Sequence, residues 1–301
     1  MAHQNYQHIR RFDPSKMRKN AHILFSGPPG SGKSFTMRDF MWWVSQQVFD
    51  AYAFTGSIED EHPLSDYIPD THVFEEFNAS VLREIVTLQE YRRDVALNEA
   101  KSRGLPGSEA RMYPTLLLFE DMEYKSKSIL SFEPVRKIIM NRRWLKMYVF
   151  VVFQYLMEFK CALRGMIDYA VFCKEPSATT REKIWRAFGG CCRTFDEFDA
   201  IFKACTQNKG VIVIDTQATD YGVENSIFWY RAKERGPFRV GSPLIWQTHQ
   251  SRYQPRIEKI MATRLNAMGG RGPTTKDGKH IVLEIDEEDE KPAGGKKKGK
   301  A

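Results

Sequence analysis

The sequence predicts an α/β fold in which helices cover both faces of a central, mostly parallel sheet. Three observations lead to this fold class. Short apolar runs alternate along the chain with segments that carry apolar residues at helical spacing. A glycine-rich loop joins the first such run to a helix, and two later runs end in the polar side chains that parallel sheets gather at one edge.

The first predicted strand is HILFS, residues 22–26, which leads into GPPGSGKS, residues 27–34. That octapeptide satisfies the pattern G-x-x-x-x-G-K-[ST]. The segment SFTMRDFMWWVSQQVF, residues 34–49, follows as a predicted helix, because apolar side chains recur in it at three- and four-residue spacing: Met37, Phe40, Met41, Val44 and Val48. A phosphate-binding loop requires this context of strand, loop and helix.

Glycines allow the backbone N–H groups of such a loop to converge on phosphate oxygens, and the helix N-terminus adds a partial positive charge. Lys33 would reach the β- and γ-phosphate oxygens, and Ser34 would ligate Mg²⁺. We therefore predict a site for ATP and Mg²⁺ made by nine consecutive residues: Gly27, Pro28, Pro29, Gly30, Ser31, Gly32, Lys33, Ser34 and Phe35. The loop alone does not identify the enzyme, because kinases, GTPases and motor ATPases share it.

The run TLLLFED, residues 115–121, ends in two adjacent acids. Glu120 and Asp121 should emerge at the carboxyl edge of a buried parallel strand, where ligands of open α/β sheets bind. Position assigns Glu120 to the Mg²⁺ shell and Asp121 to the general base, although most ATPases with an added strand beside the phosphate loop read Asp then Glu. A second register, with Asp121 on the metal and Glu123 as base, stays open.

A second buried run, MYVFVVFQ, ends in Gln154. A terminal amide there fits a group that senses the γ-phosphate and orients the attacking water, or one that only caps the strand. Three arginines on neighbouring segments could stabilise transition-state charge from an adjacent subunit: Arg142, Arg143 and Arg164. Arg164 is preferred, because it follows the glutamine strand and its loop.

Other segments complete the alternation of strands and helices. An Asn78 cap and the capping box Thr194-x-x-Glu197 mark two helix starts. Further elements are predicted at residues 49–57, 78–103, 194–207, 210–217 and 226–232. The phosphate-loop strand, the acidic strand and the glutamine strand, in that order, predict a RecA-like (ASCE) P-loop NTPase core.

Composition bounds the class of protein. The 301 residues are 42% hydrophobic and carry a formal net charge of +7, which is compatible with a polyanionic partner. No apolar run reaches about 18 residues, so we expect a soluble intracellular protein without stable membrane insertion. The five cysteines are odd in number and form no paired CxxC motifs, which favours reduced thiols over disulfides or zinc.

The C-terminal end differs from the rest. From about Ala267 the chain is rich in glycine and charge, with the acidic block EIDEEDE followed by KPAGGKKKGKA. We predict an N-terminal extension at 1–20, a P-loop ATPase domain at 21–250, and a C-terminal extension with a disordered charged tail at 251–301.

Together the motifs resemble the virion genome-packaging ATPases of poxviruses and other large DNA viruses, within the FtsK–HerA clade of ring-shaped DNA translocases. The resemblance covers roughly residues 15–245 and depends on the order and spacing of GPPGSGKS, LLLFED, NRRWLK before VFVVFQY, LRGMIDYAVF, FGG with TFDEFDAIF, VIVID, and SIFWYRA with PFRVG. By matching position, Lys33 and Ser34 are the nucleotide-binding pair, Glu120 and Asp121 the second acidic motif, and Gln154 the polar sensor.

The resemblance implies a homo-oligomeric ring, a pentamer or hexamer, that drives double-stranded DNA into a preformed capsid without reading its sequence. It also implies capsid or membrane-associated virion proteins as partners, and a place in the host cytoplasm or viral factory, with retention in the virion also open. Loops flanking the acidic strand could supply channel cations: Lys101, Arg103, Arg111, Lys125 and Lys127. A small-molecule or nucleoside kinase and a nucleotide-dependent capsid-docking switch remain the alternative functions.

Overall fold

A computed structural model describes residues 8–56, 63–121, 132–154, 164–220 and 222–252 of the chain. By its internal contacts the chain divides into one unit up to Ser251 and a second from Arg252 onward. Glu123, Lys125, Lys127 and Cys161 lie outside the described residues, as does nearly all of the predicted tail at 251–301.

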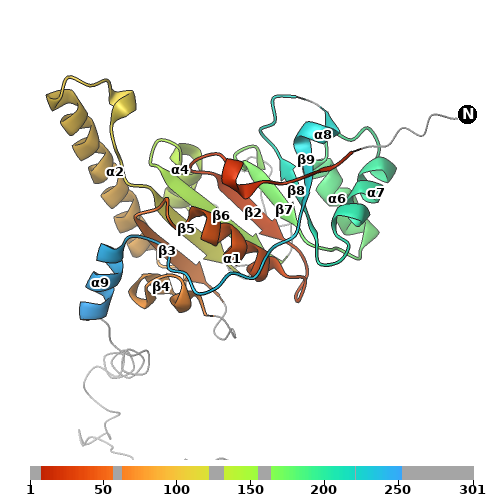
Figure 1. Cartoon of the computed structure of the whole chain (residues 1–301), viewed down its shortest axis with the longest axis horizontal. Helices are drawn as coiled ribbons and strands as arrows, with labels where there is room; N and C mark the ends of the chain where they lie inside the picture. Colours follow the sequence, from red (N-terminus) through yellow and green to blue (C-terminus); the bar gives the residue numbers. More distant parts are fainter. Residues whose placement is uncertain (1–7, 57–62, 122–131, 155–163, 221, 253–301) are drawn as a thin grey trace, which may run out of the picture. The chain divides into compact units, whose positions relative to one another are not determined.

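The described strands form one mixed sheet in the order β1-β9-β8-β7-β2-β6-β5-β3-β4 (Figure 1). Their bounds are β1 (Arg10–Arg11), β2 (His22–Ser26), β3 (Asp50–Thr55), β4 (Val73–Phe74), β5 (Thr115–Glu120), β6 (Met147–Phe153), β7 (Tyr169–Phe172), β8 (Val211–Asp215) and β9 (Ile227–Tyr230). The short edge strand β1 belongs to the predicted N-terminal extension, and it pairs in parallel with β9.

The centre of the sheet is parallel, as the predicted RecA-like core requires. β6, the glutamine strand, lies between β2, which leads into the phosphate loop, and β5, the acidic strand. β7 flanks β2 on its other side, and β3 flanks β5. All of these pairs are parallel, so the carboxyl ends of these strands meet at one edge of the sheet. Parallel neighbours are joined by crossover connections, which are right-handed.

One strand departs from the parallel expectation. β8 runs antiparallel to β7 and to β9. The connection from β7 to β8 contains two packed helices, α6 (Ala178–Phe188) and α7 (Phe195–Cys205), where an ordinary crossover has one. A second helix returns the chain to the edge that it left, so the next strand must run in the opposite direction.

Side-chain hydrogen bonds mark the beginning of one helix and the end of another. The bounds of the others are α1 (Lys33–Val44), α2 (Ala79–Ser102), α4 (Glu133–Asn141), α8 (Val223–Ser226) and α9 (Pro243–Arg252). The predicted Asn78 cap of α2 is confirmed: its side-chain oxygen accepts hydrogen bonds from the N–H groups of Ser80 and Val81. α1 ends earlier than predicted, because the hydroxyl of Ser45 donates to the carbonyl of Trp42 and competes with the helical bonds.

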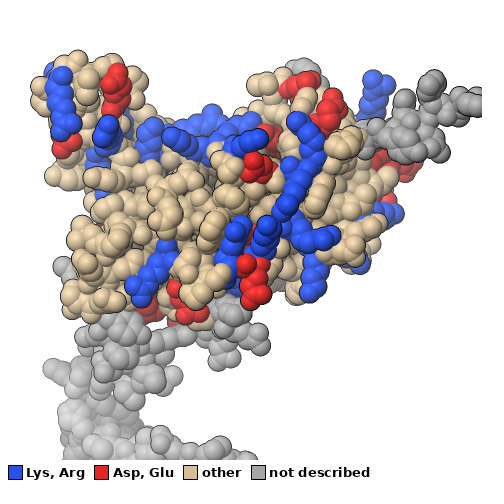
Figure 2. All heavy atoms as spheres, viewed as in Figure 1, with Lys and Arg blue, Asp and Glu red and all other residues tan. Residues whose placement is uncertain are grey.

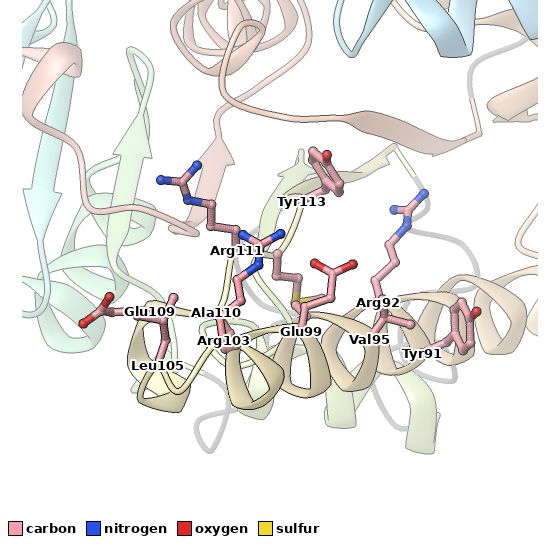
Figure 3. Close-up of a pocket in the computed structure, with 13 residues that line it drawn as sticks. Tyr91, Arg92, Val95, Glu99, Arg103, Leu105, Glu109, Ala110, Arg111 and Tyr113 are labelled. Carbon is pink, nitrogen blue, oxygen red and sulfur yellow. The ribbon is translucent and has the colours of Figure 1, made fainter.

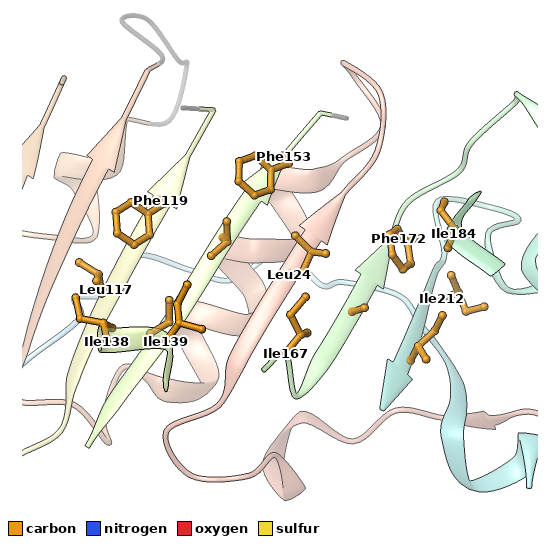
Figure 4. Close-up of a cluster of buried hydrophobic side chains, with 14 of the residues drawn as sticks. Leu24, Leu117, Phe119, Ile138, Ile139, Phe153, Ile167, Phe172, Ile184 and Ile212 are labelled. Atoms are coloured by element: carbon orange, nitrogen blue, oxygen red, sulfur yellow. The ribbon is translucent and has the colours of Figure 1, made fainter. Parts of the chain in front are cut away.

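Helices cover both faces of the sheet, as predicted. Ile23 and Phe25 of β2 face α1 and belong to one buried cluster, whereas Leu24 between them belongs to the other. Figure 4 shows this second cluster, in which side chains of β5, β6 and β7 meet those of α4 and α6. The two buried clusters pack against opposite faces of β2 and thereby fix the position of the loop that follows it.

The helices in the described ranges were compared with what a membrane span requires. None of them combines sufficient length with sufficient apolarity to cross a bilayer.

Candidate nucleotide-binding site

The glycine-rich loop follows β2 directly and turns into α1. Gly32 is the N-cap residue of α1 and has the left-handed backbone (φ 92°), and Gly30 is left-handed as well (φ 71°). Gly27 is required for space, since a Cβ there would lie 2.8 Å from the Cβ of Cys173 and 2.8 Å from Ser31 Oγ. The loop therefore requires glycine at Gly30 and Gly32 for conformational reasons and at Gly27 for steric reasons.

Lys33 is held against this loop. Its side chain is buried, and its ammonium group donates to the carbonyl of Pro28 at 3.2 Å. The ammonium group thus lies against the backbone of the loop, where a phosphate oxygen would replace the carbonyl as acceptor. Phe35, on the first turn of α1, is 41% exposed beside the loop.

Ser34 joins the phosphate loop to the acidic strand. Its hydroxyl donates to Glu120 Oε1 at 2.8 Å, although the two residues are 86 positions apart in the sequence. Glu120 is the last residue of β5 and is buried. A hydroxyl and a carboxylate oxygen at hydrogen-bond distance are the donor set that Mg²⁺ takes beside a bound triphosphate, so these residues fit the metal that the sequence predicts.

Asp121 and Gln154 lie at the same edge of the sheet. Asp121 follows β5 with a left-handed backbone (φ 48°), and its N–H donates to the carbonyl of Val152 on β6 at 3.3 Å. Gln154 follows β6, and the register that pairs Ser26 with Phe153 aligns it with Gly27. The structure therefore brings the two acids and the amide to the edge that carries the phosphate loop.

The three candidate arginines lie at the opposite edge, before β6 and β7. Arg142 is buried and donates to Asp168 Oδ2 at 2.7 Å, while Arg143 donates to Oδ1 at 2.7 Å. A buried, paired Arg142 cannot reach another subunit, so this candidate is wrong. Arg164 precedes β7 and so lies at the amino edge. The five residues of β2 span about 16 Å between that edge and the phosphate loop, so Arg164 cannot serve the phosphate loop of its own chain. Its predicted role across subunits stays a prediction.

Cys173 was not predicted to belong to the site. It follows β7 and lies beneath the loop, where burial raises the pKa of its thiol. Sequence pattern alone gave no signal for this contact, because it depends on β7 pairing with β2.

A cleft in the described residues lies away from this site. It has a volume of about 560 Å³ and lies between α2 and the segment that precedes β5. Figure 3 shows Arg92, Glu99, Arg103 and Arg111 around it. This cleft is at the amino end of β5, whereas Glu120 is at the carboxyl end, so the cleft is separate from the candidate nucleotide site. The predicted channel cations Arg103 and Arg111 belong to this distant edge.

Comparison with known proteins gives viral relatives. No family model matches the chain. It is 24% identical over 210 residues to the uncharacterized protein 088R of Invertebrate iridescent virus 3, covering 70% of this chain and 75% of that protein. It is 23% identical over 260 residues to the uncharacterized protein L437 of Acanthamoeba polyphaga mimivirus, covering 84% and 88%. Both relatives are viral proteins, as the resemblance to virion ATPases predicted.

Among solved structures, the chain matches the genome packaging NTPase B204 from Sulfolobus turreted icosahedral virus 2 in complex with ATP-gammaS. The match covers 72% of this chain and 100% of that chain at 12% identity, with a TM-score of 0.47. EssC from Geobacillus thermodenitrificans, in a structure of its ATPases 2 and 3, matches 77% of this chain and 43% of that chain at 10% identity, with a TM-score of 0.48.

Proposed function

We propose that the protein is an ATPase that couples hydrolysis to the movement of double-stranded DNA into a preformed viral capsid. The observation that carries the proposal is the contact between Ser34 and Glu120, 2.8 Å, at the edge where the phosphate loop opens. Two further polar groups, Asp121 and Gln154, follow strands at that edge. This combination supports hydrolysis of a triphosphate more than simple binding.

Each residue has a distinct role in the proposal. The loop amides and Lys33 bind the β- and γ-phosphates, and Ser34 with Glu120 would hold Mg²⁺. When bound, the metal neutralises charge that develops on the phosphate oxygens. Asp121 removes the proton from the attacking water, and Gln154 orients that water. The contact of Glu120 with Ser34 favours Glu120 over Asp121 as the residue on the metal side.

Work on DNA requires subunits that act in turn, so the proposal includes a homo-oligomeric ring in which Arg164 approaches the phosphate loop of a neighbour. The motif order and the viral relatives support a role in genome packaging. On this proposal the ring works in the host cytoplasm or viral factory, and its partners are duplex DNA and virion proteins.

The decisive measurement is steady-state phosphate release from ATP, with and without long duplex DNA. We expect turnover that duplex DNA stimulates, and we expect Lys33→Ala to abolish it. Arg164→Ala should inactivate a pure ring, whereas mixing it with Lys33→Ala subunits should restore part of the turnover, because each variant supplies what the other lacks. Mixed rings without any recovery would reject Arg164 as a group that acts across subunits.

The same assay separates the alternatives. A kinase would transfer phosphate to an added nucleoside and would be indifferent to DNA. A docking switch would bind ATP with negligible turnover. Either result would refute the proposed motor.

A further inference from the structure

A second, smaller cleft lies at the amino edge of the sheet, away from the nucleotide site. It has a volume of about 240 Å³ and lies between α2, the turn at 107–112, and the segment that joins α4 to β6. Among the described residues that line it, Arg93, Arg143 and Lys146 are cationic and none is acidic. Trp144, which is 47% exposed, also lines it.

Contacts with neighbouring groups fix the positions of two of these cations. The guanidinium of Arg93 lies over the ring of Trp144, with its carbon 3.4 Å from the ring centroid, so the N–H edges of the group stay available to acceptors. Arg93 also donates to the exposed carboxylate of Asp94 at 3.2 Å, an exposed pair of the kind that contributes little. Lys146 has a left-handed backbone (φ 51°), and its carbonyl is bound by the N–H of Thr115. The turn that presents the lysine is therefore fixed at its base.

The positive charge continues beyond the cleft along the edge. The exposed Lys19 precedes β2, and Lys146 precedes β6, the parallel neighbour of β2. Both lysines therefore lie at the amino edge of the sheet, before two adjacent strands. Figure 2 shows Lys and Arg side chains in a row across the top of the view, between α2 and the region of β8 and β9.

Acidic groups at the start of β7 and the end of β8 do not cancel this charge. Asp168 is buried and fully engaged by arginines, and Asp215 has 14% of its side chain exposed beneath Arg18. Arg18 and Arg143 are more exposed to solvent than the acids with which they pair. We call the surface made by Lys19, Arg93, Arg143, Trp144 and Lys146 the amino-edge basic surface.

We propose that the amino-edge basic surface binds the phosphate backbone of duplex DNA. Cations gathered at one edge of the sheet match a polymer that carries about one negative charge per 1.7 Å of helix axis. Arginine and lysine contacts of this kind hold DNA without reading its sequence. The inference rests on the proposed function for its partner, and it adds that DNA meets the sheet at the edge opposite the ATP.

The test compares two triple variants of the full chain that remove equal charge. The test variant is K19Q/R93Q/K146Q. The control is K183Q/R186Q/K209Q, which matches it feature by feature: Lys183 is exposed like Lys19, Arg186 pairs with a carboxylate on its own helix as Arg93 does, and Lys209 shares the left-handed backbone of Lys146. Binding of a labelled duplex is measured by fluorescence anisotropy at several salt concentrations.

We expect the test variant to bind more weakly than the control and to have a shallower salt dependence. Three lost phosphate contacts reduce the slope of log K against log salt by about 2.7, so affinity falls roughly 40-fold less between 50 and 200 mM salt. DNA should also change the tryptophan emission of the wild type, and Trp144→Phe should remove most of that change. Equal affinities and slopes in the two triple variants would overturn the inference.

Failure of the surface and failure of the proposed function give different results. If the surface is wrong, the test variant binds DNA as the control does, and DNA still stimulates hydrolysis in both. If the ATPase proposal is wrong, the wild type shows no turnover, yet the comparison of DNA binding can still be made. A wild type that binds no duplex would refute both.

Discussion

The buried histidine His22 should make folding stability depend on pH. Its side chain is fully buried at the start of β2, and burial, together with the nearby Arg142 guanidinium, lowers its pKa from 6.5 to about 4. Between these values the unfolded chain binds a proton that the folded chain does not. The contribution of His22 to stability is therefore fully present above pH 6.5 and is lost as the pH falls toward 4.

The size of this loss follows from the two pKa values. A group that titrates at 6.5 when unfolded and at about 4 when folded contributes roughly 2 kcal/mol less at pH 5 than at pH 7.5. Carboxylates with lowered pKa values, such as Asp168, lose their contribution only as the pH falls below about 4. The loss of stability measured at pH 5 therefore reports the titration of histidine and not that of the carboxylates.

The assay is urea unfolding of the wild type and of His22→Asn at both pH values. Asparagine cannot titrate, and its amide can still donate to the Met166 carbonyl that lies 3.1 Å from Nδ1 of His22. The free energy of unfolding of the variant should fall by roughly 2 kcal/mol less than that of the wild type. The pKa of His72 is also lowered by burial, but that residue is present in both proteins. Equal pH dependence in the wild type and His22→Asn would refute this reasoning, and the exposed His8→Asn serves as the control.

Three further outcomes test the site and its support. Glu120→Gln should keep the hydrogen bond to Ser34 but lower the rate of ATP hydrolysis by about 10² or more, since a neutral amide is a poor metal ligand; an unchanged rate would remove Glu120 from the site. Gly27→Ala should weaken binding of a fluorescent ATP analogue, and Cys173→Gly in the same chain should restore part of it by vacating the contacted Cβ; no recovery would contradict the steric argument. Asp168→Leu should destabilise the fold by about 3 to 5 kcal/mol in urea unfolding, because it strands a buried arginine; a loss under about 1 kcal/mol would show that the ion pair is dispensable.

Much of the site could be predicted because its functional residues lie within short segments of the sequence. The loop from Gly27 to Ser34 carries its own glycines, lysine and hydroxyl, and the acids and the amide each terminate an apolar run. In a parallel sheet such termini meet at one edge whatever the order of the strands. Placing Ser34 and Glu120 at the same edge therefore needed only the assumption of parallel strands, whereas their contact also needed the observed strand order.

Other features depended on pairings that no local pattern encodes. The antiparallel direction of β8 follows from two helices between it and β7, and the candidate Arg142 was wrong because it is buried against Asp168. The amino-edge basic surface likewise combines Lys19, Arg93 and Lys146 from segments that only β2, β6 and the packing of α2 bring together.

By itself the sequence determined which residues can grip a triphosphate and on which kind of sheet edge they emerge, since both depend on neighbours within a few positions along the chain. Only the tertiary structure decided that Cys173 underlies the loop, that Arg164 lies at the far edge, and that positive charge gathers there above a buried Asp168. Those facts are set by strand order, register and burial, which join positions more than a hundred residues apart through the packing of the whole sheet.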